Sequence, residues 1–339
     1  MFVKNLWYVA GWSSHVEPRA LLDRTIAGER AVFFRTADGT IRALENRCLH
    51  RSAPLSLGIH EGDGIRCNYH GVRYDAGGAC VEIPGQSMIP KKACVRSYPV
   101  VERQGWIWFW PGDAALADPA KIPQIKGLGE PGWGMRTGYL PYATHYELIN
   151  DNLLDLSHIS YLHSASFGGG NMAWASEIPT ATRLENGFYS ERWMAAQPRA
   201  DGTGVLYDNL NVYEFLIPGV LGIFSEFQLA GAGPRESMST AEGYAANWTW
   251  QAITPATERS THYFFSMALP EPVSDATLDK AMEGMLVGFE EDRIMIEAQQ
   301  KLLDEDMSGR GTSSLTIAHD GPMQQMRKII ERMLEAEAA

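Results

Sequence analysis

Four residues in the first seventy have the types and spacing of metal ligands. The segments CLHR and CNYHG place Cys48 two residues before His50 and Cys67 three residues before His70. Iron–sulfur clusters held by cysteine alone use thiolates throughout, whereas one iron of a Rieske-type [2Fe–2S] cluster is bound by two histidines. One sulfur and one nitrogen ligand in each segment fit that arrangement. The pattern therefore predicts such a cluster and one-electron redox chemistry.

A structural zinc ion is the alternative, because zinc also accepts two cysteines and two histidines. Zinc sites usually pair like residues, as Cys-x-x-Cys and His-x₃₋₅-His, while each segment here mixes the two types. The ligand order therefore favours iron–sulfur, and a colourless protein that contained zinc would indicate the alternative.

A second group of possible ligands lies in the segment NDNLLDLSHISYLH, which contains Asn152, Asp155, His158 and His163. On one continuous helix, Asp155 and His158 would share a face, one turn apart. His163 would lie about 140° round the helix from His158, so both can bind one metal only if the helix bends or ends between them. Two histidines at this spacing are weak evidence alone, and ordinary core or surface histidines are an equal alternative.

A carboxylate would complete a non-haem iron site of two histidines and one acid. The segment MEGMLVGFEEDRIMIEAQQ offers Glu290, Glu291, Asp292 and Glu297, of which only Asp292 falls on the apolar stripe of Met285, Phe289 and Ile296. Its glutamates lie about 120° or more from that stripe. An acid within an apolar stripe is costly unless it is paired or bound to metal. We therefore expect Asp292 to join the two histidines.

The elements that must position these groups divide the chain into two parts. From Trp7 to Trp110, short apolar or alternating runs separated by turn residues predict an all-β domain, with a hairpin turn at Asp38-Gly39. A proline-containing segment then places the boundary near residue 118, giving domains 1–118 and 119–339. The second part mixes helices and strands and is predicted to be α+β: helices over 146–162, 276–303 and 324–339, strands within 205–227 and 245–267.

Composition narrows the possible partners. The formal charge of −12 and pI near 5.2 argue against a nucleic-acid partner or an anionic membrane, and leave a protein partner open. The longest apolar run, 215–224, is too short for a membrane span and contains Pro218. The N-terminus has no pattern of a signal peptide, so we expect a cytoplasmic protein. Cys80 and Cys94 are expected to be small buried residues without chemistry.

Taken together, the two Cys/His segments and NDNLLDLSHISYLH resemble the ligand motifs of the Rieske non-haem iron oxygenases. The resemblance covers essentially the whole chain and is greatest to the short O-demethylases acting on vanillate or dicamba and to toluenesulfonate methyl-monooxygenase. Respiratory Rieske proteins carry two further cysteines, whose places are taken here by Ala53 and Tyr69. The resemblance implies an N-terminal all-β Rieske domain and an α+β catalytic domain of the helix-grip type.

The resemblance also implies assignments for individual residues. Cys48, His50, Cys67 and His70 would bind the [2Fe–2S] cluster, and His158, His163 and Asp292 would bind mononuclear Fe(II). The family forms homotrimers in which the cluster of one subunit lies near the iron of the next. Asp155 would bridge from His158 to His70 of a neighbouring subunit, and Asn152 would belong to the same catalytic group.

The activity implied is that of a terminal oxygenase. It would use O₂ and electrons from NAD(P)H, delivered by a ferredoxin and/or a flavin reductase, to hydroxylate or O-demethylate a small aromatic substrate. Gln251 is a candidate substrate contact; dicamba-type relatives have His there, and Gln cannot hold a carboxylate by charge. Strand aromatics such as Trp248 and Trp250 could line the pocket, although core packing is commoner. A ring-dihydroxylating dioxygenase and a Rieske electron-transfer protein without oxygenase activity remain as alternatives.

Overall fold

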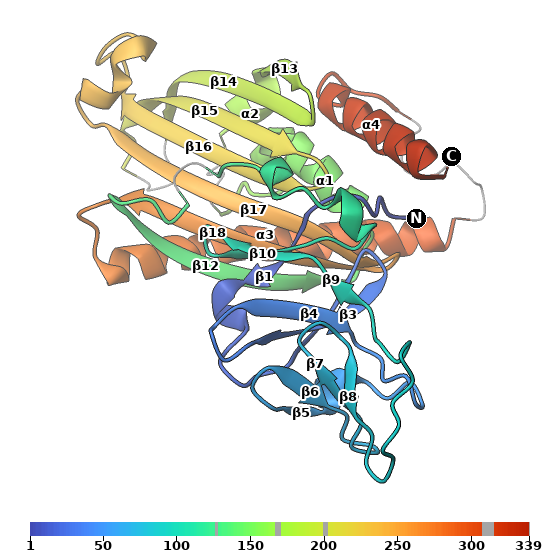
Figure 1. Cartoon of the computed structure of the whole chain (residues 1–339). Helices are drawn as coiled ribbons and strands as arrows, with labels where there is room; N and C mark the ends of the chain where they lie inside the picture. Colours follow the sequence, from blue (N-terminus) through green and yellow to red (C-terminus); the bar gives the residue numbers. More distant parts are fainter. Residues whose placement is uncertain (126–127, 167–170, 199–202, 307–314, 339) are drawn as a thin grey trace. The chain divides into compact units, whose positions relative to one another are not determined.

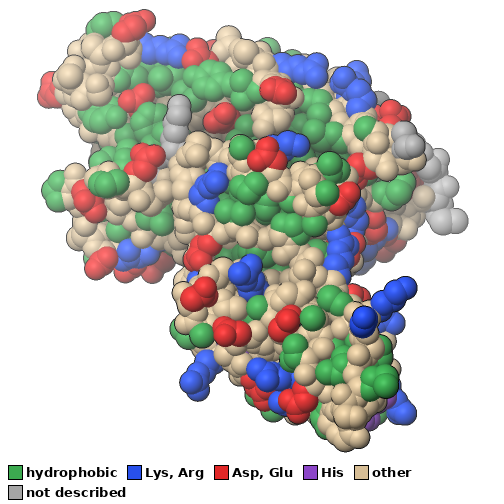
Figure 2. Space-filling view, in the orientation of Figure 1, with side chains coloured by type: hydrophobic (Ala, Val, Ile, Leu, Met, Phe, Trp, Pro, Cys, Tyr) green, Lys and Arg blue, Asp and Glu red, His purple; other side chains and the backbone are tan. Residues whose placement is uncertain are grey.

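The chain forms two compact units. The computed structural model describes residues 1–125, 128–166, 171–198, 203–306 and 315–338. One unit comprises Met1–Gln124 with Thr254–Thr257 and the last residues of the chain; the other comprises Ile125–Ile253 and Glu258–Glu335. In the described part, no helix is both long enough and apolar enough to cross a membrane. On the face shown in Figure 2, Lys and Arg side chains are interspersed with Asp and Glu.

The first unit is built from three small sheets, which confirms the predicted all-β domain (Figure 1). The first sheet contains β1 (Tyr8–Trp12), β11 (Trp106–Phe109) and β10 (Val100–Arg103); the second contains β2 (Leu22–Ile26), β3 (Glu29–Arg35), β4 (Ile41–Glu45) and β9 (Ser97–Tyr98). The third contains β5 (Ile59–His60), β6 (Gly64–Arg66), β7 (Arg73–Asp75) and β8 (Cys80–Glu82). Short 3₁₀ turns η1 (Ser13–His15), η2 (Leu55–Leu57), η3 (Ala114–Leu116) and η4 (Pro119–Lys121) connect or follow them.

Strand β3 explains how this unit holds its metal-binding loops. Its sequence ERAVFFR buries both faces, so that alternate side chains enter two different cores. Phe33 packs into a core with Tyr8 and Phe109. Val32 and Phe34 face the second core, which also contains Cys48 and Cys67. The two cysteine-bearing loops therefore rest on a packed apolar base.

The second unit contains a seven-stranded antiparallel sheet in the order β12-β18-β17-β16-β15-β14-β13. The strands are β12 (Trp133–Tyr142), β13 (Thr180–Leu184), β14 (Gly187–Pro198), β15 (Leu206–Leu216), β16 (Val220–Leu229), β17 (Ala245–Thr257) and β18 (Ser260–Pro270). The helices are α1 (Tyr146–Leu154), α2 (Ala173–Ser176), α3 (Asp275–Asp304) and α4 (Gly321–Ala338), with 3₁₀ turns η5 (Leu156–Ser160) and η6 (Arg235–Thr240). Figure 1 shows α1, α2 and α3 on one face of this sheet, which agrees with the predicted α+β class.

Helix α3 confirms the prediction for 276–303 and extends it slightly at both ends. Ser274 caps the helix by accepting a hydrogen bond from the backbone N–H of Thr277. Along the helix, Phe289, Asp292 and Ile296 are all buried, as the apolar periodicity predicted. The 3.6-residue period thus places one carboxylate on the face that packs against the sheet.

The predicted helix over 146–162 is wrong beyond Leu154. Helix α1 ends there, and Asp155 has non-helical backbone angles, φ −127° and ψ 89°. Its carboxylate accepts a hydrogen bond from Ser157 N, which begins the separate turn η5. Asp155 therefore caps a new turn, and it does not share an α-helical face with His158. Because the helix ends before His158, the separation of about 140° that a continuous helix would impose on His158 and His163 does not apply.

Candidate metal centres

The two Cys/His loops of the first unit have the same backbone hydrogen-bond pattern. Cys48 N donates to Ala53 O at 2.8 Å, and Cys67 N donates to Val72 O at 2.8 Å, five residues on in each case. Four residues after each cysteine the chain turns back and donates to the cysteine carbonyl at 2.9 Å. That position has positive φ in both loops, 57° at Ser52 and 74° at Gly71. The loops are therefore structural equivalents, although their histidines stand at different offsets.

The loops present sulfur inside and nitrogen outside. Cys48 and Cys67 are buried, whereas His50 and His70 are exposed and their ring centroids lie 4.4 Å apart. This division suits a cluster with one iron held by thiolates in the interior and the other by imidazoles at the surface.

Neighbouring groups support these ligands. Leu49 N donates to Tyr74 Oη at 3.0 Å, which leaves the phenol hydrogen for Cys48 Sγ at 3.3 Å. Burial raises the pKa of the Cys67 thiol, so the deprotonated ligand needs the positive charge of a metal. Hydrogen bonds to the sulfur ligands are one of the means by which proteins tune cluster potential.

Arg66 fixes the second loop from outside. Its guanidinium donates to Gly71 O at 2.9 Å and forms ion pairs with Glu61 at 2.7 Å and Glu82 at 2.8 Å. Hydrogen bonds from Arg66 lower the pKa values of both glutamates. Arg66 and Gly71, which stand before and after the Cys67–His70 segment, are thereby tied to Glu61, just after β5, and to Glu82 in β8.

The other two cysteines lie outside this site. Both are free thiols, so no disulfide joins them. Cys80 is buried, as expected, but Cys94 is exposed, and the expectation of burial was wrong for that residue.

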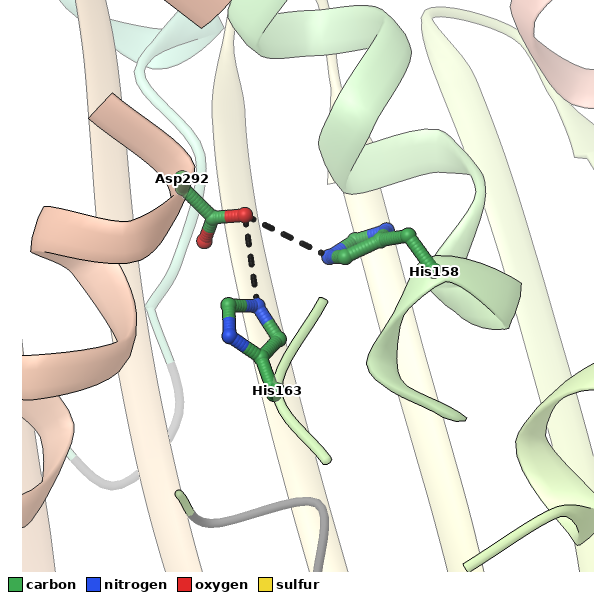
Figure 3. A group of neighbouring side chains, drawn as sticks. All are labelled: His158, His163 and Asp292. Atoms are coloured by element: carbon green, nitrogen blue, oxygen red, sulfur yellow. Dashed lines mark ion pairs between the residues drawn. The ribbon is translucent and has the colours of Figure 1, made fainter. Parts of the chain in front are cut away.

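In the second unit, His158, His163 and Asp292 converge (Figure 3). The Asp292 Oδ1 atom lies 3.6 Å from His158 Nε2 and 3.2 Å from His163 Nε2. All three ligand atoms lie within 4.8 Å of one another. Two imidazole nitrogens and one carboxylate oxygen from a turn, a loop and a helix form the donor set of a mononuclear non-haem iron site. The sequence therefore predicted correctly which residues come together.

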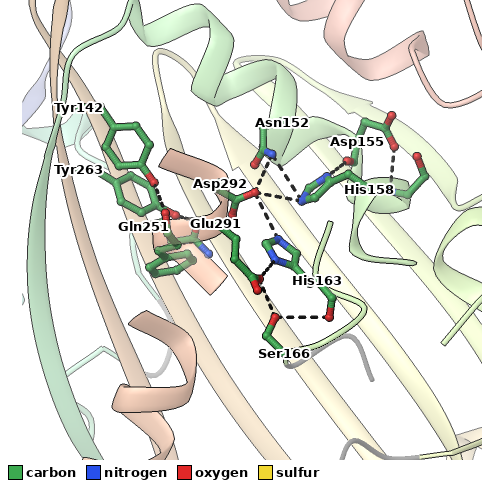
Figure 4. A network of polar contacts seen from close by, with 12 residues as sticks. Tyr142, Asn152, Asp155, His158, His163, Ser166, Gln251, Tyr263, Glu291 and Asp292 are labelled. Carbon is green, nitrogen blue, oxygen red and sulfur yellow. Dashed lines mark hydrogen bonds and ion pairs between the residues drawn. The ribbon is translucent and has the colours of Figure 1, made fainter. Parts of the chain in front are cut away.

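Hydrogen bonds at the opposite ring nitrogens hold both imidazoles in this orientation (Figure 4). His158 Nδ1 contacts the backbone carbonyl of Asp155 at 2.5 Å, and His163 Nδ1 contacts Glu291 Oε2 at 2.7 Å. Each Nδ1 is therefore the protonated nitrogen, and each Nε2 is left for a metal. Both imidazoles are therefore in the tautomer that a metal ion at Nε2 requires.

The two imidazoles differ in charge environment. Burial lowers the pKa of His158. Burial acts in the same direction on His163, but the Asp292 and Glu291 carboxylates outweigh it and raise the pKa of His163. Metal binding must displace the proton that these carboxylates favour, so metal affinity should fall in acid.

Asn152 and Asp155 also lie at this site. Asn152 Nδ2 donates to Asp292 Oδ1 at 3.0 Å and lies 3.4 Å from His158 Nε2. Asp155 contacts His158 through its backbone carbonyl, and its carboxylate instead accepts from Ser157 N. The expectation that the Asp155 carboxylate orients His158 was therefore wrong within the chain. That carboxylate borders a separate hollow of about 1020 Å³.

Glu291 also contacts this group, and sequence reasoning missed it. Helical periodicity placed it away from the apolar stripe, yet its carboxylate contacts His163 Nδ1 and accepts from Ser166 Oγ at 2.6 Å. A glutamate side chain is long enough to reach round the edge of a helix. In the sequence, only its position directly before Asp292 indicated that it could lie near the metal site.

A cavity of about 440 Å³ opens onto the His/His/Asp group. Helix residues such as Leu153, Met285 and Phe289 form one wall, and strand residues such as Ile223 and Gln251 form the other. Its size suits a ligand with one aromatic ring. Trp248 and Trp250 do not line it, since strand alternation places them opposite to Thr249 and Gln251.

The orientation of the Gln251 side chain is fixed. Tyr263 Oη donates to Gln251 Oε1 at 2.5 Å, and both side chains are buried (Figure 4). Burial raises the pKa of Tyr263 well above 10, so this phenol remains a donor. Because Oε1 is occupied, Gln251 presents its NH₂ group to the cavity.

Two Cys/His loops on a β domain, and a His/His/Asp group beside a cavity between a sheet and helices, define a Rieske-type non-haem iron oxygenase. Residues 6–99 match the Rieske [2Fe–2S] domain. Residues 142–336 match the vanillate O-demethylase oxygenase C-terminal domain, and the chain belongs to that family.

Similar proteins cover essentially the whole chain. It is 37% identical to the iron–sulfur subunit of the toluene-4-sulfonate monooxygenase system of Comamonas testosteroni, over 99% of this chain and 98% of that one. It is 34% identical to the vanillate O-demethylase oxygenase subunit of Pseudomonas sp. HR199, over 99% and 96%. The crystal structure of dicamba monooxygenase bound to 3,6-dichlorosalicylic acid superposes with TM-score 0.90 at 29% identity, covering 100% and 99%. These matches favour the oxygenase over both alternatives.

Proposed function

We propose that this chain is the terminal oxygenase component of a multicomponent monooxygenase that hydroxylates or O-demethylates a small aromatic substrate. The observation that carries the proposal is the His158, His163 and Asp292 group at the cavity. The names of the relatives, a monooxygenase system subunit and an O-demethylase oxygenase subunit, support it. Electrons would come from NAD(P)H through a flavin reductase, with or without a ferredoxin, and we place the protein in the cytoplasm with that partner.

In this proposal each domain has its own metal. Cys48, His50, Cys67 and His70, in domain 1–118, hold the [2Fe–2S] cluster; His158, His163 and Asp292, in domain 119–339, hold the iron. The bound metals supply single-electron delivery and O₂ activation. The chain's own residues fix both imidazole tautomers, and the apolar helical wall excludes water from the substrate. Gln251 donates a hydrogen bond to a substrate acceptor.

We further propose a homotrimer in which the cluster of one subunit serves the iron of the next. The hollow that contains Asp155 is also lined by Tyr161 and Leu302, which are 68% and 70% exposed. Beside the cluster histidines, Tyr69 is 60% exposed. Exposed apolar groups around both redox sites support burial against a second copy. Asp155 would accept a hydrogen bond from His70 of the neighbouring subunit, and the assembly should have three times the chain mass of 37.6 kDa.

Mixed oligomers test transfer between subunits. Cys67→Ala should lose the cluster but keep the iron, and Asp292→Ala should lose the iron but keep the cluster. Each variant alone should be inactive, which metal and sulfide analysis can verify. Co-expressed chains should regain part of the activity, because an intact cluster then faces an intact iron on another chain. If transfer occurs within one chain, no mixture of the two will be active.

Metal content and product analysis test the function itself. The oxygenase should contain three iron atoms per chain, against two for an electron carrier. With reductase, NADH and ¹⁸O₂, a panel of methoxybenzoates, toluates and aryl sulfonates should yield formaldehyde and a phenol, or a hydroxymethyl product with one ¹⁸O. A cis-diol with two ¹⁸O atoms would instead identify a ring dioxygenase.

A further inference from the structure

The cavity beside the His/His/Asp group is elongated along helix α3. Its helical wall includes Asp292, Phe289, Gly284 and Lys280. The first and last of these are twelve residues apart in the sequence, which corresponds to about 18 Å along an α-helix. An aromatic ring with one small substituent is shorter than this wall. The cavity therefore accommodates a ring together with an extension of it.

Burial distinguishes the inner end of the cavity from the outer end. Phe289 packs against Tyr263, with ring centroids 5.1 Å apart, and both residues are buried, as is Asp292. Gly284 and Lys280, which line the same cavity, are exposed. The cavity therefore runs from the His/His/Asp group to a rim on α3 that faces solvent. We call Gly284 and Lys280 the rim residues.

The sheet confirms this direction and shows what surrounds the rim. Leu278 packs on Gly134, whose partner on β18 is Leu269. Phe289 packs on Tyr263, which lies further back on the same strand. Helix α3 therefore runs alongside β18 for the whole length of the cavity. Between these two contacts the cavity is lined by three apolar side chains from the helix and the strand: Met267, Ala281 and Met285.

Gly284 is an unexpected residue at this rim. A glycine within a helix destabilises it relative to alanine, and Gly284 lies in the middle of α3. Its φ is not positive, so the backbone does not require glycine. Apart from the helix's own backbone, no described atom lies within 4 Å of the place where a Cβ would stand. Neither conformation nor close packing therefore explains the glycine. What it provides is a gap in the wall of the cavity.

We propose that Gly284 is a specificity-determining residue, and that its gap admits a ring whose non-reacting end carries an extended apolar substituent. This inference rests on the proposed oxygenase function and names its substrate class. The reacting group lies at the His/His/Asp group, and the extension passes Gly284 on its way to solvent. Gly284 and Asp292 are eight residues apart, or about 12 Å along the helix, so only a ligand longer than this reaches the gap.

Ligands of increasing length test the proposal. Under anaerobic conditions and without reductase, calorimetry on the holoenzyme would measure N-methyl-, N-butyl- and N-hexyl-4-methylbenzamide, which are neutral and differ only in chain length. The wild-type protein should bind the N-hexyl compound at least as tightly as the N-methyl compound. Gly284→Phe should weaken binding of the N-hexyl compound about 10-fold or more, and that of the N-methyl compound less than about 3-fold. Gly284→Ala should stay within about 2-fold of the wild type for all three.

A matched control separates the gap from a general effect on the helix. Val287→Phe adds the same ring to α3 at a position that is 54% exposed and does not line the cavity, so it should keep the wild-type affinities. Alanine and phenylalanine both form helices more readily than glycine, so these variants should fold.

Four results would overturn the proposal. They are a wild-type protein that binds only the N-methyl compound or none of the three, wild-type affinities in Gly284→Phe, an equal loss for short and long compounds in that variant, and an equal loss in Val287→Phe. Iron content and reduction of the cluster by NADH do not depend on Gly284. Failure here therefore remains distinguishable from failure of the oxygenase assignment.

Discussion

Glu291 provides the sharpest test of the iron site. Its carboxylate lies 2.7 Å from Nδ1 of the fully buried His163, and its own side chain is 28% exposed. Glu291→Gln keeps an acceptor for that nitrogen but removes the negative charge. Hydrogen bonds to charged groups contribute about 1.5–3 kcal/mol and neutral ones about 0.5–1.5 kcal/mol. The difference of about 1–1.5 kcal/mol corresponds to roughly 5- to 13-fold weaker iron binding.

The assay is an anaerobic titration of the iron-free protein with Fe(II) against a competing chelator, with cluster absorbance as the internal standard. Glu290→Gln is the matched control, because it makes the same chemical change one residue earlier, where the carboxylate pairs with Arg293. Glu291→Ala should weaken iron binding further, by about 10- to 100-fold, since it leaves His163 Nδ1 without its acceptor. Equal iron affinity in Glu291→Gln and Glu290→Gln would refute the role of this carboxylate.

Three further changes should separate electron transfer, cluster retention and substrate binding. Asp155→Asn keeps a cap for η5, so both metals should stay bound while NADH-driven turnover is nearly abolished; normal turnover would contradict the bridge. Arg66→Met should release the cluster, and Arg136→Met, which breaks a comparable pair of ion pairs in the other unit, should not. Hydrogen bonds from Arg66 lower the pKa values of Glu61 and Glu82 from 4.5. The two ion pairs therefore stabilise the loop fully above that pH and are lost as the glutamates become protonated in stronger acid. The visible absorbance of the cluster should accordingly hold near pH 5 and disappear in stronger acid. Tyr263→Phe frees the amide of Gln251 and should weaken substrate binding roughly 2- to 12-fold by calorimetry; an unchanged Kd would show that the amide needs no such support.

The candidate metal ligands could be predicted to lie together because their constraints are local or periodic. Ligand order within the CLHR and CNYHG segments distinguished iron–sulfur from zinc. Asp292 was found from the 3.6-residue period, since its position on a buried stripe is a property of one helix. Both inferences used only residues that lie close in sequence.

The break at Asp155 was harder to predict because two local preferences compete there. The composition of 146–162 favours a helix throughout, yet an aspartate followed by a serine can also cap a new turn. In the structure the capping hydrogen bond to Ser157 prevails. The new turn then brings His163 beside His158, which a continuous helix could not do.

Glu291 could not be placed from sequence because its contact depends on how distant segments pack together. Glu291 acts through a side chain that reaches across to a loop about 130 residues earlier.

The shared backbone frame of the two cluster loops explains why their histidines can stand at different distances from their cysteines. Both loops close on the same pair of hydrogen bonds, from the fourth residue to the cysteine carbonyl and from the cysteine to the fifth residue. His50 and His70 stand two and three residues after their cysteines, so both precede the residue of positive φ. The common frame fixes where each loop turns, and either offset then brings an imidazole to the exposed side. The sulfur ligands are fixed by the core beneath them, and the nitrogen ligands by the turn above.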